Sequence, residues 1–305
     1  MTAQLSSTPG APGSIKPRSK GIKAMLTHRT FRRITQLAFA AFITFLVVQQ
    51  IVFGEDGATV TASAEAFCPF GGLETLYKYI TGGGTFVAHT HLSNVVLLVA
   101  VLAVALLLRS AFCGWICPLG FLQDLVHNLS RFVQKRLPGL QRSINSLKKR
   151  GARLAVLDRY LRYIKYLVLA WAIGGSAYFG YMVFRDYDPW STLLNIAEFS
   201  FTPGVIVLAV TLIASLFIER PWCRYACPLG AVSGLVGKLS PVYLKREDSA
   251  CTSCKICTQS CPMGLNVHTA KTIKSVDCIS CLECVKACPR NGALEVKIGL
   301  PLIGK

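Results

Sequence analysis

Four long apolar stretches without charged residues alternate with polar segments along the chain. They cover Ile34–Phe53, Leu92–Leu108, Tyr166–Phe184 and Phe201–Ile218. A helix rises about 1.5 Å per residue, so stretches of this length approach or reach the ~30 Å thickness of a bilayer core. The pattern therefore predicts a mainly α fold with an integral membrane four-helix bundle, which we place in residues 34–240.

Two further segments are characterised by their polar pattern. Residues 1–33 carry seven basic residues and no acidic one, which predicts a disordered basic cytoplasmic tail. Leu119–Leu137 has apolar residues at helical spacing and is rich in Lys and Arg near its end. We expect a helix along the cytoplasmic interface of the membrane, and a soluble helix packed on the C-terminal domain is the alternative.

Charge and composition set the orientation. The chain is 52% hydrophobic with a net charge of +18, and alternate polar segments hold 31 of its 33 basic residues. The positive-inside rule then predicts a multi-pass protein of the bacterial inner membrane, with both termini in the cytoplasm. Attraction of basic loops to anionic membrane lipid explains the charge, so we expect no nucleic-acid partner.

The segment after the last apolar stretch repeats the pattern Cys-x2-Cys-x2-Cys-x3-Cys-Pro. This is the spacing of bacterial ferredoxins that bind two [4Fe–4S] clusters, and the fourth Cys of each run ligates the other cluster. The predicted ligand sets are Cys251, Cys254, Cys257 and Cys288 for the first cluster, and Cys278, Cys281, Cys284 and Cys261 for the second. A zinc site would need only four ligands, so residues 241–305 are predicted to form an α+β ferredoxin domain.

A second motif, Cys-x3-Cys-Pro, occurs twice at an offset of 110 residues, at Cys113 and Cys117 and again at Cys223 and Cys227. On a helix, positions i and i+4 share one face. The duplication predicts two parallel hairpins related by an axis along the membrane normal, which can bring four thiols together. Three interpretations stay open: a third metal centre (iron–sulfur or copper), redox-active dithiols, or structural cysteines. The duplication favours the metal centre.

Three residues on the expected outer side are weaker candidates. Cys68 is a single cysteine, for which structural burial is the default and a docking or cofactor role the alternative. His89 and His91 lie near the outer membrane face, where they are candidates for hydrogen bonding to a quinone head group. Ordinary interfacial histidines are the competing interpretation.

Together, the apolar stretches, the two Cys-x3-Cys-Pro motifs and the two-cluster ferredoxin runs resemble the NapH-type polyferredoxins, which are quinol-dehydrogenase membrane components. NosR and the copper-reducing oxidase assembly factor CcoG share this core. The resemblance covers about residues 34–290. It implies a 4Fe-4S electron-transfer subunit of a membrane oxidoreductase, with the quinone pool and a partner redox subunit or reductase as partners.

Two functions follow from these observations. The first is electron transfer between quinol, or a cytoplasmic donor, and a partner reductase. The second is metal handling, in which the quartet of cysteines binds copper that the ferredoxin reduces. The first meets a physical difficulty: the clusters are expected inside, so a quinol site on the outer side would be separated from them by roughly the ~30 Å hydrocarbon thickness.

Overall fold

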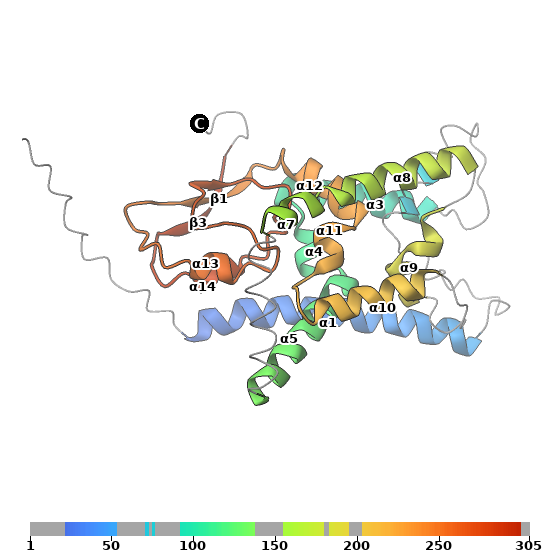
Figure 1. Ribbon diagram of the computed structural model, residues 1–305, viewed down its shortest axis with the longest axis horizontal. Helices are drawn as coiled ribbons and strands as arrows, with labels where there is room; N and C mark the ends of the chain where they lie inside the picture. Colours follow the sequence, from blue (N-terminus) through green and yellow to red (C-terminus); the bar gives the residue numbers. More distant parts are fainter. Residues whose placement is uncertain are drawn as a thin grey trace, which may run out of the picture.

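The computed structural model describes residues 22–53, 71–72, 75–76, 92–137, 155–179, 183–194 and 203–299. Four helices run along the long axis of the molecule, and a small sheet domain lies at one end (Figure 1). These helices are α1 (Ile22–Phe53), α3 (Leu92–Leu108), α8 (Ile164–Phe179) and α10 (Pro203–Ser215). Helices α1 and α8 lead away from the sheet domain, whereas α3 and α10 lead back toward it (Figure 1).

Short helices connect these long ones. They are α4 (Ala111–Trp115), α5 (Pro118–Arg136), α7 (Ala155–Leu161), the 3-10 helix η3 (Arg185–Tyr187), α9 (Pro189–Leu194), α11 (Pro221–Tyr225) and α12 (Pro228–Gly237).

The four apolar stretches are helical, but their lengths differ from those expected. Among the described residues, one helix is long and apolar enough to cross a membrane, over Thr30–Gln49 within α1. Helix α3 covers the apolar stretch Leu92–Leu108. Helix α8 ends before a turn at Val183, and α10 ends at Ser215, so both end inside the predicted stretches. Membrane association is supported, and the four-span bundle stays a prediction.

The outward faces of these helices are apolar. Ile34 and Phe45 of α1 are 56% and 61% exposed, and Ile206 of α10 is 68% exposed. Soluble monomers seldom expose apolar patches that extend over several helices. Exposed apolar faces of this kind mark contact sites, either for lipid or for another protein.

The prediction of a disordered tail over residues 1–33 is wrong for its last part, which is helical from Ile22 onward. Helix α1 begins at Ile22, well before the apolar stretch, and extends beside the sheet domain (Figure 1). Arg32 is buried there and forms ion pairs with Asp124 and Glu283. These partners are distant in sequence, so basic composition alone did not reveal that the segment is held in place.

Helix α5 occupies nearly the range expected for the interfacial helix. It packs on α10 and α1, and its polar residues Gln123 and His127 face inward. Leu129 and Phe132 are instead exposed. Exposed apolar residues on such a helix fit a membrane interface, and the interfacial position stays a prediction.

The internal repeat is visible as two copies of the same three-helix order, α3–α4–α5 and α10–α11–α12. The copies cross over: α12 of the second copy packs on α3 of the first, and α5 of the first packs on α10 of the second. Each copy therefore buries its last helix against the other.

The C-terminal domain is a three-stranded antiparallel sheet in the order β2–β1–β3. Its strands are β1 (Val242–Arg246), β2 (Thr272–Ile273) and β3 (Leu294–Ile298), and its helices are α13 (Ile256–Gln259) and α14 (Glu283–Ala287). Leu244 of the central strand pairs with Ile273 and Val296. Leu244 and Ile273 form a core with Val267 and Leu294 that also includes Cys284.

Candidate metal centres

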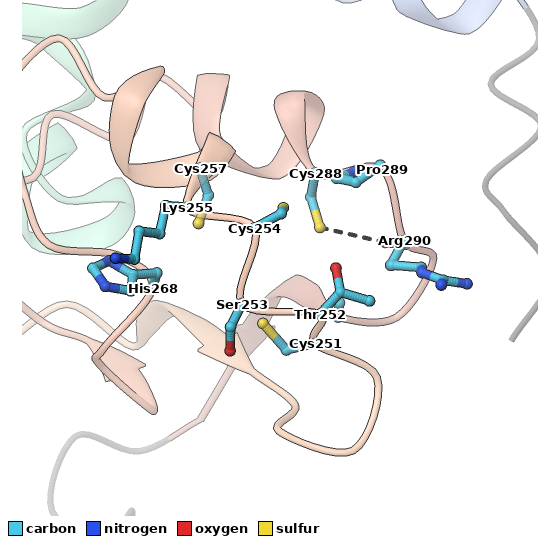
Figure 2. A pocket seen from close by; sticks show the side chains of 11 residues that line it. Cys251, Thr252, Ser253, Cys254, Lys255, Cys257, His268, Cys288, Pro289 and Arg290 are labelled. Atoms are coloured by element: carbon cyan, nitrogen blue, oxygen red, sulfur yellow. Dashed lines mark hydrogen bonds between the residues drawn. The ribbon is translucent and has the colours of Figure 1, made fainter. Parts of the chain in front are cut away.

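The first ferredoxin site is a cavity of about 310 Å³ lined by the four cysteines predicted for the first cluster, Cys251, Cys254, Cys257 and Cys288. Figure 2 shows their side chains around a common space, with Cys288 coming from beyond α14. Cys254 is exposed. Lys255 and Arg290 also line this cavity and bring positive charge to its rim.

The second ferredoxin site is a cavity of about 350 Å³ lined by Cys261, Cys278, Cys281 and Cys284. Its remaining wall is apolar and includes Met263 and Ile279. Cys281 and Cys284 are buried. The fourth cysteine of each run thus lies with three cysteines of the other run, as the predicted ligand sets require.

The backbone of both runs has the same unusual turns. Ser253 and Lys255 have φ of 50° and 60°, and the equivalent Ser280 and Leu282 have φ of 47° and 56°. Side-chain-bearing residues rarely adopt this region. Turns that alternate in this way direct successive backbone N–H groups into one concavity, which suits an anionic iron–sulfur group. The local geometry of both cavities therefore fits a cluster held by thiolates.

The remaining four described cysteines are arranged by the crossed repeats. Cys113 and Cys223 lie in the short helices α4 and α11, whereas Cys117 and Cys227 precede the prolines that begin α5 and α12. We call these four residues the quartet. Its members lie close enough together to raise one another's pKa.

Burial has the largest effect on these thiols. It raises the pKa of Cys113 to about 11 and that of Cys223 to about 12. Thiols with such pKa values are protonated at neutral pH, so a bound metal is needed to hold them as thiolates. The quartet thus has the donor set of a metal centre, in a place where unliganded thiolates are disfavoured.

Each copy of the repeat supplies a polar side chain to the first cysteine of the other copy. Gln123 Nε2 donates to Cys223 Sγ at 3.6 Å, and Ser233 Oγ lies 4.0 Å from Cys113 Sγ. Gln123 and Ser233 are themselves 110 residues apart, as are the cysteines. Sequence analysis missed both, although polar residues at equivalent repeat positions were a usable signal.

Two buried arginines accompany the quartet. Arg220 is fully buried, makes two hydrogen bonds of 2.7 and 2.6 Å to Asp124, and donates to the Cys113 carbonyl at 2.5 Å. Arg32 donates to the Gly114 carbonyl at 3.0 Å. The positive charge near the quartet therefore comes from these two residues.

Two other arginines near the motifs along the chain, Arg109 and Arg224, have different partners. Arg109 instead donates to the Ile273 and Ser275 carbonyls. Arg224 pairs with Asp158 at 2.6 Å.

The quartet and the second ferredoxin site are packed together. Cys113 shares one buried core with Cys281, Ile279 and Met263. A Cβ on Gly114 would lie 2.3 Å from the Ile279 carbonyl oxygen, so the two backbones touch. Trp115 Nε1 donates to the Ser280 carbonyl at 3.0 Å. The loop that carries Cys281 thus docks directly on the turn that carries Cys113.

The structure gives no geometry for the three weaker candidates of the sequence analysis. Cys68, His89 and His91 lie outside the described residues. In the described part of the chain, no three His, Cys, Asp or Glu side chains are close enough to share one metal ion. This applies to the ferredoxin cysteines as well as to the quartet.

Comparison with known proteins places these sites in a family. A family profile described as a 4Fe-4S binding domain matches residues 90–136 and 200–246, and one described as a 4Fe-4S dicluster domain matches 243–289. The putative electron transport protein YccM of Escherichia coli is 32% identical over 285 residues, which cover 90% of this chain and 77% of YccM. This chain belongs to the YccM, NapH and NosR family of 4Fe-4S electron-transport proteins.

Two other members of the 4Fe-4S electron-transport family match about half of this chain. The ferredoxin-type protein NapH of Haemophilus influenzae is 30% identical over 167 residues, 54% of this chain and 51% of NapH. The regulatory protein NosR of Pseudomonas aeruginosa is 31% identical over 159 residues, 50% of this chain and 20% of NosR. No solved structure matches. The resemblance to NapH-type proteins is confirmed, and this protein is an iron–sulfur electron-transport protein.

Proposed function

We propose that this protein carries electrons at a membrane through three [4Fe–4S] clusters in series. The quartet would hold one cluster, Cys261, Cys278, Cys281 and Cys284 the second, and Cys251, Cys254, Cys257 and Cys288 the third. The observation that carries the proposal is the shared core of Cys113 and Cys281. Bound clusters would supply one-electron acceptors, with potentials set by their surroundings.

The chain's own residues support a cluster at the quartet. One match of the 4Fe-4S binding-domain profile covers each Cys-x3-Cys-Pro copy. Gln123, as well as the backbone N–H of Gly230, donates to a quartet sulfur. Arg220 and Arg32 bring positive charge to the centre, which stabilises an anionic group in a buried place.

The exposed end of the series is the site with Cys254. Cys254 is exposed whereas Cys281 and Cys284 are buried, so a partner redox protein can approach the first ferredoxin site more closely than the second. Lys255 and Arg290 beside it favour a partner with an acidic surface.

At the other end, we propose a link to the membrane quinone pool. The helices around the quartet expose apolar faces, which suits exchange with a lipid-soluble carrier. Phe184, from the end of the third apolar stretch, stacks on Trp222 with ring centroids 6.4 Å apart. A quinol bound near these residues would avoid the transmembrane gap that an outer site creates.

Metal analysis of the purified full-length protein tests the cluster assignment. Three clusters require about twelve iron atoms per chain, and the double variant Cys113→Ser, Cys223→Ser should lose about four. Reduction of the iron–sulfur signals by duroquinol tests the quinone link. An unchanged iron content in the double variant would reject the cluster at the quartet. Copper bound in proportion to protein, and lost in that variant, would indicate metal handling instead.

The proposed topology has four spans with both termini in the cytoplasm. Helices α1, α3, α8 and α10 run alternately away from and toward the ferredoxin domain, which supports it (Figure 1). A C-terminal green fluorescent protein fusion should fluoresce and a C-terminal alkaline phosphatase fusion should be inactive. The opposite pair of results would overturn the orientation.

A further inference from the structure

A cavity of about 460 Å³ has Cys117 and Cys227 in its wall. The first cysteines of the two motifs, Cys113 and Cys223, are not among its lining residues. Most of the wall is apolar or aromatic and includes Phe184 and Trp222. Ligand sites in proteins commonly combine an apolar and aromatic lining with a few polar groups.

Two polar groups lie in this wall, and both come from the start of α9. The carboxyl of Asp188 is buried and accepts a hydrogen bond from the backbone N–H of Trp190 at 3.1 Å. The indole Nε1 of Trp190 is buried and has no hydrogen-bond partner among the described residues. Buried donors without partners are uncommon in native proteins, so this one points to an acceptor on a bound molecule.

The surroundings restrict what that molecule is. The outer faces of α1 and α10 are apolar. A ligand that reaches the cavity past these faces is expected to be soluble in lipid. The aromatic wall suits a flat ring. A ring oxygen that accepts would satisfy the indole N–H, and a ring hydroxyl that donates would suit the carboxyl.

We propose that this cavity binds the ring of a membrane quinone, with Trp190 Nε1 and the Asp188 carboxyl as its polar contacts. The proposal rests on the proposed quinone link and adds the place and the residues of binding. It differs from the outer site suggested by His89 and His91, because Asp188 and Trp190 share their cavity with the quartet.

The chemistry of Asp188 suits such a ligand. Burial raises the pKa of Asp188 to about 7, although hydrogen bonds from the backbone N–H groups of Trp190 and Ser191 oppose the shift. A carboxyl that titrates near neutrality can hold a proton or release one at physiological pH. Asp188 can therefore accept a proton from a ring hydroxyl.

Binding of a fluorescent quinol mimic, heptylhydroxyquinoline N-oxide, tests the proposal on the full-length protein in detergent with its clusters. Asp188→Asn keeps a good helix N-cap but loses the ionisable group. It should weaken binding about tenfold or more, as expected for loss of a hydrogen bond to a charged group. Asp186→Asn is the matched control, because Asp186 is nearby and exposed. It should bind the mimic like the unaltered protein.

Trp190→Phe keeps an aromatic wall and removes only the N–H, so it should weaken binding about fivefold. Iron content and thermal unfolding of each variant check that the fold is intact. Absence of saturable binding would overturn the proposal. Equal binding by Asp188→Asn and Asp186→Asn, together with unchanged binding by Trp190→Phe, would also overturn it.

The binding measurement involves no electron transfer, so the two proposals fail separately. If the variants weaken binding as expected but duroquinol does not reduce the clusters, the binding site stands and the quinone-linked function falls. If duroquinol reduces the clusters equally well in all variants, which also bind the mimic normally, quinol reacts at another site.

Discussion

Gln123 and Ser233 occupy equivalent positions in the two copies of the repeat, and each lies against the first cysteine of the opposite copy. The exchange follows from the crossed packing of α5 on α10 and of α12 on α3. Each pair of cysteines is thus surrounded partly by the other copy. The quartet depends on both copies and would not be complete in either alone.

We expect Gln123→Leu to lower the reduction potential of the centre at the quartet. A donor to sulfur stabilises the more negative reduced state, and a hydrogen bond worth about 1 kcal/mol corresponds to roughly 40 mV for one electron. A redox titration followed by electron paramagnetic resonance measures the change. Gln134→Leu is the control, because Gln134 is buried on the same helix but donates to Ser130. Equal potentials in the two variants would contradict a role for Gln123.

Arg32→Ala should weaken the attachment of the ferredoxin domain. The guanidinium bonds to the Gly114 carbonyl, Asp124 and Glu283, and its loss leaves Glu283 partly buried without that cation. Removing one member of such a network costs about 2–4 kcal/mol. Thermal unfolding and limited proteolysis near Lys238 detect the effect. Arg33→Ala, at an exposed neighbour, should change stability by about 0.5 kcal/mol or less.

Gly114→Ala should separate the ferredoxin from the turn that carries Cys113. The new Cβ would lie 2.3 Å from the Ile279 carbonyl oxygen, which is too close for any real contact. Gly174→Ala is the matched control, since nothing lies within 4 Å of a Cβ there and α8 should become slightly more stable. The measurement is the rate at which ferredoxin clusters are reduced after reduction begins at the quartet. Similar rates in both variants would mean that electrons do not follow this contact.

Cys254→Ala and Cys281→Ala should each remove about four iron atoms per chain and abolish electron transfer. Metal ligation supplies folding energy to small domains, so both variants should also lose protection from proteases within residues 241–299. We expect the larger loss for Cys281→Ala, because Cys281 is buried and packs with Cys113 whereas Cys254 is exposed. Iron and sulfide analysis provides the check. Full iron content in both variants would refute the ligand sets.

The ferredoxin sites could be predicted from sequence because their determinants are local. Two identical cysteine spacings define both sets, and the structure lines one cavity with each set. The apolar stretch Leu92–Leu108 was likewise predicted to be helical, because apolar length alone indicates it. The repeat also predicted that Cys113 and Cys223 approach each other, and the Cys223 thiol is close enough to raise the pKa of Cys113.

The rest depends on contacts between distant residues. From the sequence, Arg32 looked like part of a basic tail. Its partners Gly114, Asp124 and Glu283 are far away along the chain, so the sequence around Arg32 does not reveal them. The role of Arg220 beside the quartet was not predicted, because nearness along the chain does not indicate where a long side chain points. Nothing in the sequence around Asp188 indicates a site, and only the structure shows that it lines a cavity with Cys117 and Cys227.

The contact between Arg32 and Glu283 also restricts when the protein can finish folding. It joins positions 251 residues apart, so it cannot form until the ribosome has made the whole segment between them. Helix α1 is therefore made long before the carboxylate on α14 that its buried arginine binds. Until then Arg32 lacks one of its two carboxylate partners. The attachment of this part of α1 to the ferredoxin domain is therefore a late step of folding, even though α1 itself is made early.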